Sequence, residues 1–374
     1  MNSFLLVFVL VACSTQTCVS LSPPHPFPIP SSRSSLPLFS LHPPFFHLPQ
    51  ATATSFHAGL LLQPLSVAFE RLPSLRKPNI RLYRDFWLYS FILGLSTSHA
   101  IFPPEWSGHL KSIAAKSPNL LSDGADHYFQ LDLELSFVAD IGSSQPKVLQ
   151  EVQHALQELT NHALATEQAT TQFTFVQCVF LTSLYHLEQM RLKAMPSSFP
   201  SVFLYLEDKG LQKDPAVWSV LRSIVSKLLM EYLAFIKTES LDKKRSSLLE
   251  HFACVLVEKL AHIHEGVRQV ASTSLTALTE AFPHLLTSPK VITCLLDQME
   301  RCFESITLLE MKGEHGGRSP RMTHSIIQLE GSQVRQAALG QLADDTKGFL
   351  RRAKQWSPQQ AKAAMQVCMC SRAW

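Results

Sequence analysis

Two histidines and an acidic residue stand close together at His262, His264 and Glu265, and imidazole and carboxylate groups are common zinc ligands. Zinc ligands must converge on one point. Two histidines one residue apart do not share a face of a helix, and no second ligand pair follows at zinc spacing. We therefore interpret them as histidines at a helix end rather than as part of a metal centre.

Two further pairs carry groups that could do chemistry. Cys368 and Cys370 could offer thiolates to a metal, yet no partner pair of ligands accompanies them. Glu207 and Asp208 are adjacent carboxyl groups, the type of group that performs general acid–base catalysis. They stand beside lysines at a helix end, where carboxylates more often form surface ion pairs worth about 0.2–0.5 kcal/mol. We favour the surface interpretation for Glu207 and Asp208, and we predict no zinc site at Cys368 and Cys370.

Motifs of nucleotide and acyl chemistry are missing from the sequence. It contains no G-x-x-x-x-G-K-[ST], no G-x-G-x-x-G and no G-x-S-x-G. The basic run Asp242–Arg245 is interpreted as a solvated turn, and attraction to a membrane surface stays open as its alternative. We accordingly predict no catalytic, cofactor-binding or metal-binding residue, and no cofactor bound to this chain.

The helix expected over residues 265–282 shows the clearest periodicity of the chain. Its apolar residues fall three or four positions apart and so line one face: Val267, Val270, Ala271, Leu275, Leu278 and Phe282. The pattern V-R-x-x-A-x-x-x-L resembles the second helix of a HEAT-type repeat. In such repeats the apolar face packs inside a stack of helices.

Similar amphipathic segments, separated by short breaks at Pro, Gly or Ser, predict a series of helices. The expected ranges are 83–95, 103–116, 147–165, 169–194, 199–208, 214–237, 245–262, 265–282, 288–311, 331–354 and 358–369. Asp214-Pro215, Ser288-Pro289 and Ser357-Pro358 each join a capping residue to a proline at the first helical position. The series predicts an all-α fold, an α-solenoid of antiparallel helix pairs of the HEAT or armadillo type.

The expected domain organisation has three parts. Residues 1–20 contain the apolar run Phe4–Ala12, which has the length of the central region of a secretory signal. Residues 21–80 are rich in Pro and Ser, so we expect them to be largely disordered. Residues 81–374 form the predicted solenoid, with loops near 117–146 and 312–330.

Composition favours a helical protein that does not bind nucleic acid. The chain has 374 residues, of which 46% are hydrophobic, and a net charge of only +3. Most of its eight cysteines fall inside apolar helical patterns, which favours a reducing compartment. The apolar segment 169–192 is interrupted by polar residues, so we expect a buried helix there rather than a membrane span.

Several segments in collinear order resemble the phosphatidylinositol 4-kinase type III alpha family. They are Arg84–Ser90 (RDFWLYS), Pro104–Trp106 (PEW), Ala115–Pro118 (AKSP), Leu181–Arg191 (LTSLYHLEQMR), Leu206–Asp214 (LEDKGLQKD), His262–Ala271 (HIHEGVRQVA), Phe282–Leu286 (FPHLL) and Val334–Pro358. The resemblance extends from about residue 81 to residue 365. It implies the helical solenoid that precedes the kinase domain in that family.

The resemblance implies a non-catalytic scaffold or docking fragment. The family phosphorylates position 4 of the inositol ring of phosphatidylinositol with ATP and magnesium, but its Asp-Arg-His-Asn and Asp-Phe-Gly signatures are absent from this sequence, where Asp85-Phe86 is followed by Trp87. The partners implied are a tetratricopeptide-repeat scaffold, hyccin, a palmitoylated anchor protein and a second copy of the chain. The location implied is the cytoplasm, peripheral at the plasma membrane.

Some parts of the sequence depart from the family pattern. The helix after His264 is strongly basic in the family, whereas here it carries Glu265, Gly266 and Gln269. The residues before about 80 and the ending CMCSRAW also differ. Two alternatives stay open: a partial gene product of an active lipid kinase whose catalytic domain is missing here, and a secreted helical protein. We expect residues 81–374 alone to aggregate or dimerise, because missing neighbour repeats would leave an apolar face uncovered.

Overall fold

In the computed structural model of the chain, the described residues are 59–72, 77–92, 95, 103–121, 146–160, 173–238, 242–312, 325–326, 329 and 331–372. They divide into two compact units, the first ending at Asp123 and the second beginning at Gly124. The signal-like segment 1–20, most of the Pro-rich segment 21–80 and most of both expected loops lie outside the described residues.

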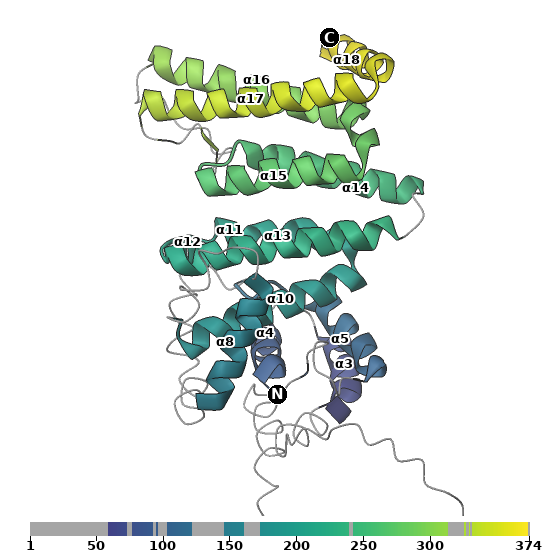
Figure 1. Cartoon of the computed structure of the whole chain (residues 1–374), viewed down its shortest axis with the longest axis vertical. Coiled ribbons are helices and arrows are strands. Elements are labelled where there is room, and N and C mark those ends of the chain that lie inside the picture. Colours follow the sequence, from purple (N-terminus) through teal and green to yellow (C-terminus); the bar gives the residue numbers. More distant parts are fainter. Residues whose placement is uncertain are drawn as a thin grey trace, which may run out of the picture. The chain divides into compact units, whose positions relative to one another are not determined.

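The described secondary structure is helical in both units (Figure 1). Over the described ranges the structure contains no β-strand, and the single isolated bridge joins His262 to Ser325. The prediction of an all-α fold is therefore confirmed.

The first unit consists of α3 (Leu62–Arg71), α4 (Lys77–Ile92) and α5 (Pro104–Lys116). Its core forms around α4, where Tyr83, Phe86 and Trp87 are buried. The Tyr83 hydroxyl donates a hydrogen bond to the backbone oxygen of Phe69 at 3.0 Å, and Trp87 Nε1 donates to Ser117 Oγ at 2.8 Å. The RDFWLYS segment therefore contributes mainly to the packed core of this unit.

Helix α3 lies inside the range that the sequence analysis expected to be largely disordered. Leu62, Ser66 and Phe69 are buried and stand four and three positions apart, which is the spacing of one helix face. The Pro-rich composition of residues 21–80 taken as a whole hid this short periodic stretch. The expectation of disorder is therefore corrected for residues 59–72.

The second unit holds the remaining helices. They are α8 (Pro146–Thr160), α10 (Phe175–Ala194), the 3-10 helix η2 (Pro196–Val202), α11 (Phe203–Glu207), α12 (Lys209–Gln212), α13 (Pro215–Lys237), α14 (Lys243–Leu260), α15 (Glu265–Ala281), the 3-10 helix η3 (Pro283–Thr287), α16 (Pro289–Lys312), α17 (Ser332–Trp356) and α18 (Pro358–Arg372). Most ends agree with the expected ranges to within a few residues.

The single helix expected over residues 199–208 is wrong. Pro200 stands inside η2, and a proline has no backbone N–H to donate to an α-helical hydrogen bond. The α-helical turn begins only at Phe203 and ends at Glu207. Asp208 is extended and starts α12, because its side chain accepts the Leu211 N–H at 2.8 Å.

Helix caps explain where several helices of the second unit begin. Thr174 and Gln177 form a capping box on α10. Asp214 accepts the N–H groups of Ala216 and Val217 at 3.1 and 3.2 Å, as predicted for the start of α13. Ser288 differs from its expected role, because its hydroxyl donates to Glu250 of α14 at 2.7 Å.

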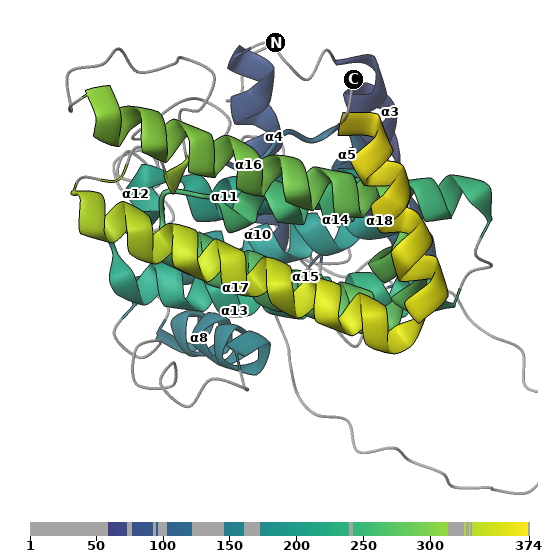
Figure 2. The same ribbon diagram turned by 90° about the horizontal axis from the view of Figure 1, so that it is seen from above.

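The helices of the second unit follow one another in layers. Figure 1 shows α13, the pair α14 and α15, and the pair α16 and α17 in succession. Seen from above, α13, α15 and α17 lie on one side, while α14 and α16 lie on the other (Figure 2). Helix α18 contacts both α16 and α17. This layering of helix pairs fits the predicted α-solenoid.

Side-chain contacts fix the register between two successive layers. Each of four contacts joins residues 73 positions apart: Arg268 with Gln341, Ser272 with Asp345, Thr279 with Arg352, and Thr287 with Gln360. The first three contacts join α15 to α17, and their constant offset means that these two helices run parallel; the fourth contact joins η3 to α18. Equivalent helices of successive repeats have this relationship in helical solenoids.

Helix α10 agrees with the expectation of a buried helix. Buried residues occur on nearly all sides of it, among them Glu188 and Arg191, which pair with each other. Among the helices that the structure describes, none combines the length and the hydrophobicity that a bilayer crossing requires.

Candidate docking groove between α15 and α17

His262 and His264 belong to the turn that joins α14 to α15. His262 is 3% exposed, and its Nδ1 accepts the backbone N–H of His264 at 3.1 Å. The ring of His264 lies 5.5 Å from that of His262. Within the described ranges, the structure places no three His, Cys, Asp or Glu residues where they could hold a metal ion. The His262 ring nitrogen thus serves to order the turn.

Arg268 stabilises the same turn through hydrogen bonds from its buried guanidinium group. It is 6% exposed, and its Nη1 donates to the backbone oxygens of His262 and Ile263, both at 3.0 Å. Burial lowers the pKa of Arg268, and the carboxylate of Glu265 opposes this shift. The Arg268 side chain therefore points into the protein, where backbone carbonyl groups accept its hydrogen bonds.

Glu207 and Asp208 do not act as a pair. Asp208 caps α12, whereas Glu207 forms an ion pair with Lys259 of α14. The expected ion pairing therefore occurs for Glu207, but with a lysine remote in sequence rather than with its neighbours. Asp242 likewise caps α14 by accepting the Arg245 N–H at 2.8 Å, and the lysines that follow it are exposed.

Of the C-terminal cysteine pair, only Cys368 has a described side chain. It is buried, and its sulfur lies 3.0 Å from Thr293 Oγ1 of α16. The side chain of Cys370 lies outside the described residues. The contact with Thr293 places Cys368 in the packing between α18 and α16.

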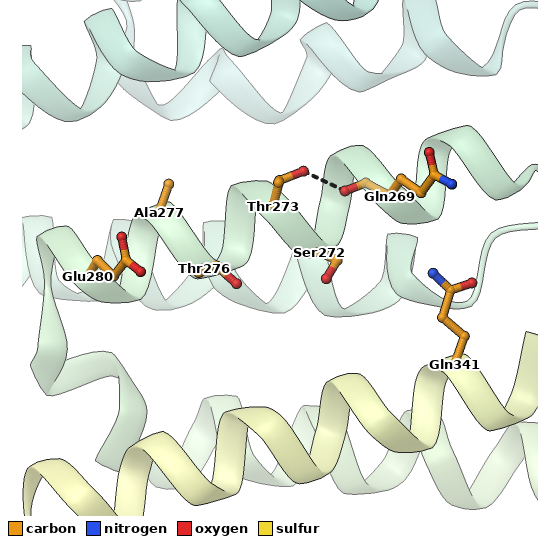
Figure 3. Close-up of a pocket in the computed structure, with 7 residues that line it drawn as sticks. All are labelled: Gln269, Ser272, Thr273, Thr276, Ala277, Glu280 and Gln341. Carbon is orange, nitrogen blue, oxygen red and sulfur yellow. Dashed lines mark hydrogen bonds between the residues drawn. The ribbon is translucent and has the colours of Figure 1, made fainter.

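A groove runs between α15 and α17, the two helices joined by the 73-residue offset. Its volume is about 520 Å³, and its lining residues are Gln269, Ser272, Thr273, Thr276, Ala277, Glu280 and Gln341 (Figure 3). Figure 3 shows Ser272 and Thr276 pointing from α15 toward α17, from which Gln341 rises. Helix α15 contributes the lining residues other than Gln341, and Figure 3 shows Thr273 and Ala277 pointing away from α17.

A smaller cavity of about 190 Å³ adjoins the groove at Ser272 and Thr276. Leu260, Leu275 and Phe349 give it apolar walls. Helix α17 adds the charged residues Asp344, Asp345 and Arg352 to its lining. The two spaces together offer apolar, hydroxyl and charged groups along one line.

Asp345 is the most unusual group of this region. Its Oδ1 accepts a hydrogen bond from Ser272 Oγ at 2.9 Å, while its Oδ2 is buried and has no hydrogen-bond partner within the described part of the chain. Burial raises the pKa of the Asp345 carboxyl, and Asp344 adds to the shift, whereas Ser272 and Arg352 oppose it. A partner that donates a hydrogen bond or carries a positive charge would be favoured here.

Arg352 supplies the opposite charge. Its Nη1 donates to Thr279 Oγ1 at 3.2 Å, and burial lowers its pKa against the influence of Glu280 and Asp345. Hydroxyl, amide, carboxylate and guanidinium groups in a shallow groove suit the recognition of a polypeptide segment through hydrogen bonds.

A family model described as the PI4-kinase N-terminal region matches residues 97–319, which is more than half of the chain. The chain belongs to this family. The resemblance inferred from the collinear segments is thereby confirmed. The matched range includes α15 but ends before α17. Residues matched by the family model therefore form only the α15 side of the groove.

The groove and its charged residues were not predicted from the sequence. Asp345 and Arg352 stand within an ordinary amphipathic helix pattern, where charged residues are expected on the solvent face. Their partners Ser272 and Thr279 lie 73 residues away. Only an alignment of α15 with α17 as equivalent helices of successive repeats could have brought these residues together.

Proposed function

We propose that this PI4-kinase N-terminal region is a non-catalytic docking platform in a phosphoinositide-kinase assembly. The observation that carries the proposal is the family match over residues 97–319. The layered helices of the second unit support it, because solenoids of stacked helix pairs commonly bind other proteins along extended surfaces. The groove between α15 and α17 is the surface we assign to this role.

The proposed partners are protein chains. By resemblance they are the tetratricopeptide-repeat scaffold, hyccin and a second copy of the chain, with no nucleic acid. The proposed location is the cytoplasm, peripheral at the plasma membrane. ATP and magnesium belong to the proposal only for a product that also contains a catalytic domain.

Binding to a purified complex of the tetratricopeptide-repeat scaffold and hyccin tests the docking role. We expect the immobilised chain to bind this complex with a Kd in the micromolar range or tighter, as measured by biolayer interferometry. Glu280→Arg, which places a long cation at the exposed edge of the groove, should weaken binding at least about tenfold, equivalent to about 1.4 kcal/mol.

Glu304→Arg is the matched control. Glu304 is also an exposed glutamate of a long helix, α16, and it does not line the groove. The control should bind like the unaltered chain. Absence of binding by the unaltered chain would contradict the docking role. Equal weakening of binding by both variants would show that the groove is not the docking surface.

A lipid-kinase assay tests the non-catalytic part of the proposal. The purified chain is incubated with phosphatidylinositol vesicles, magnesium and radiolabelled ATP. We expect no phosphatidylinositol 4-phosphate above the background of a no-protein sample, and time-dependent product formation would overturn this part of the proposal.

A further inference from the structure

Cys254 of α14 and Cys294 of α16 meet between two successive helix pairs. The Cys294 thiol donates a hydrogen bond to the backbone oxygen of Cys254, with the sulfur and the oxygen 3.7 Å apart. Both are free thiols and half-buried, whereas Cys178, Cys302 and Cys368 are fully buried. Among the cysteines whose side chains are described, these two combine mutual contact with partial exposure.

A neighbouring contact holds the two helices in register. Ser288 Oγ donates to Glu250 Oε1 at 2.7 Å, and Glu250 stands one helical turn before Cys254. Helices α14 and α16 pack against each other along this interface. The two cysteines therefore meet because α14 packs against α16.

The two thiols differ in acidity. The interaction with the neighbouring Cys294 thiol lowers the pKa of Cys254, and the charge of Lys290 acts in the same direction, against burial and against Glu258 and Glu250. The interaction with Cys254 raises the pKa of Cys294, and burial adds to this, while Arg301 opposes it. Cys254 is therefore the more acidic thiol of the two.

We propose that Cys254 and Cys294 form a peroxide-reactive dithiol site that closes to a disulfide between α14 and α16. In the first step the Cys254 thiolate attacks one peroxide oxygen. The S–O bond forms, the O–O bond breaks and hydroxide leaves, so that sulfur is oxidised to a sulfenic acid and the peroxide is reduced. In the second step the Cys294 sulfur attacks the Cys254 sulfur. The S–S bond forms, and the sulfenic hydroxyl leaves as water with the Cys294 proton.

The expected consequence is a covalent link between successive helix pairs. The 40-residue spacing of the two cysteines places one in each pair, so the disulfide joins neighbours that otherwise touch only through packing and hydrogen bonds. The oxidised chain should therefore open less readily between these pairs. The site does not depend on the docking role, since it needs only the packing of α14 on α16.

Peptide mapping of the native chain tests the site directly. The full chain is exposed to hydrogen peroxide at low molar excess, quenched with catalase, alkylated with N-ethylmaleimide and digested without reductant. We expect a peptide pair joined through Cys254 and Cys294, two hydrogens lighter than the separate peptides, with Cys178 and Cys302 still reduced. Treatment with a thiol reductant should restore both free peptides.

Single substitutions separate the two steps. Cys294→Ser should let the Cys254 sulfenic acid accumulate, where a dimedone probe captures it. Cys254→Ser should slow the oxidation of Cys294 at least about tenfold, and Cys178→Ser should leave the cross-link unchanged. Absence of the joined peptide from the unaltered chain, or its formation no sooner than the oxidation of the buried cysteines, would overturn the proposal.

Discussion

Gly266 lies directly against the indole ring of Trp218. A Cβ atom placed on Gly266 would lie 2.0 Å from Trp218 Cη2, far inside van der Waals contact. Trp218 is itself held, because its Nε1 donates to the backbone oxygen of Leu206 at 3.4 Å and the guanidinium of Arg222 lies 5.2 Å from its ring. The glycine near the start of α15 thus lets α13 and α15 approach closely.

The first prediction concerns this approach. Gly266→Ala should lower the free energy of unfolding by about 1–3 kcal/mol, because the added methyl group forces the indole or α15 to move. Urea denaturation followed by circular dichroism measures the change. The control is Gly340→Ala in α17, where nothing lies within 4 Å of an added Cβ. This variant should gain about 0.5–1 kcal/mol from helix propensity, and equal effects at the two positions would contradict the prediction.

The second prediction concerns Arg268. Arg268→Lys keeps the charge but cannot reproduce the paired hydrogen bonds from Nη1 to the oxygens of His262 and Ile263. We expect a loss of about 1–3 kcal/mol in the free energy of unfolding, since buried carbonyl groups lose their donor. Arg351→Lys, at an exposed position of α17, should change stability by less than about 0.5 kcal/mol. A loss of similar size in both variants would count against the role of Arg268 in the turn.

The features that could be predicted from the sequence are the local ones. Asp214-Pro215 marks the start of α13 because a cap and its helix are adjacent in the chain. The apolar face of α15 follows from its spacing, and Val267, Ala271 and Leu278 are buried as that pattern requires. Each of these signals is contained within a few turns of helix.

The features that could not be predicted depend on contacts between distant segments. Ser272 meets Asp345 across 73 residues, and Cys254 meets Cys294 across 40. No local pattern distinguishes these side chains from others of their type. The groove and the dithiol site therefore emerge only once the helices are stacked in register.

The third prediction uses the acidity of Asp345. Folding raises the pKa of this carboxyl above its ordinary value of 3.8, chiefly through burial. A group with a raised pKa contributes stability below its ordinary pKa, and that contribution is lost as the pH rises through the folded value. Asp345→Asn should therefore gain in melting temperature relative to the unaltered chain as the pH rises from about 3.8 toward 7.

Differential scanning fluorimetry over this pH range measures the effect. Glu304→Gln on α16 is the control, because it also removes one negative charge but from an exposed position outside the groove. The difference in melting temperature between Asp345→Asn and this control should grow with pH. A difference that stays constant, or shrinks, would show that burial of Asp345 does not govern its acidity.

The fourth prediction concerns Asp214, which joins the starts of two helices. Its Oδ1 caps α13, and its Oδ2 accepts a hydrogen bond at 3.0 Å from Gln177, the residue that completes the capping box of α10. Asp214→Ala removes both contacts and should lower the free energy of unfolding by about 1–2 kcal/mol. Asp214→Asn should lose only a few tenths of that amount, because an asparagine side chain can still accept the N–H groups of Ala216 and Val217. Urea denaturation decides between them: equal losses would mean that the charge of Asp214, rather than its capping geometry, stabilises this junction.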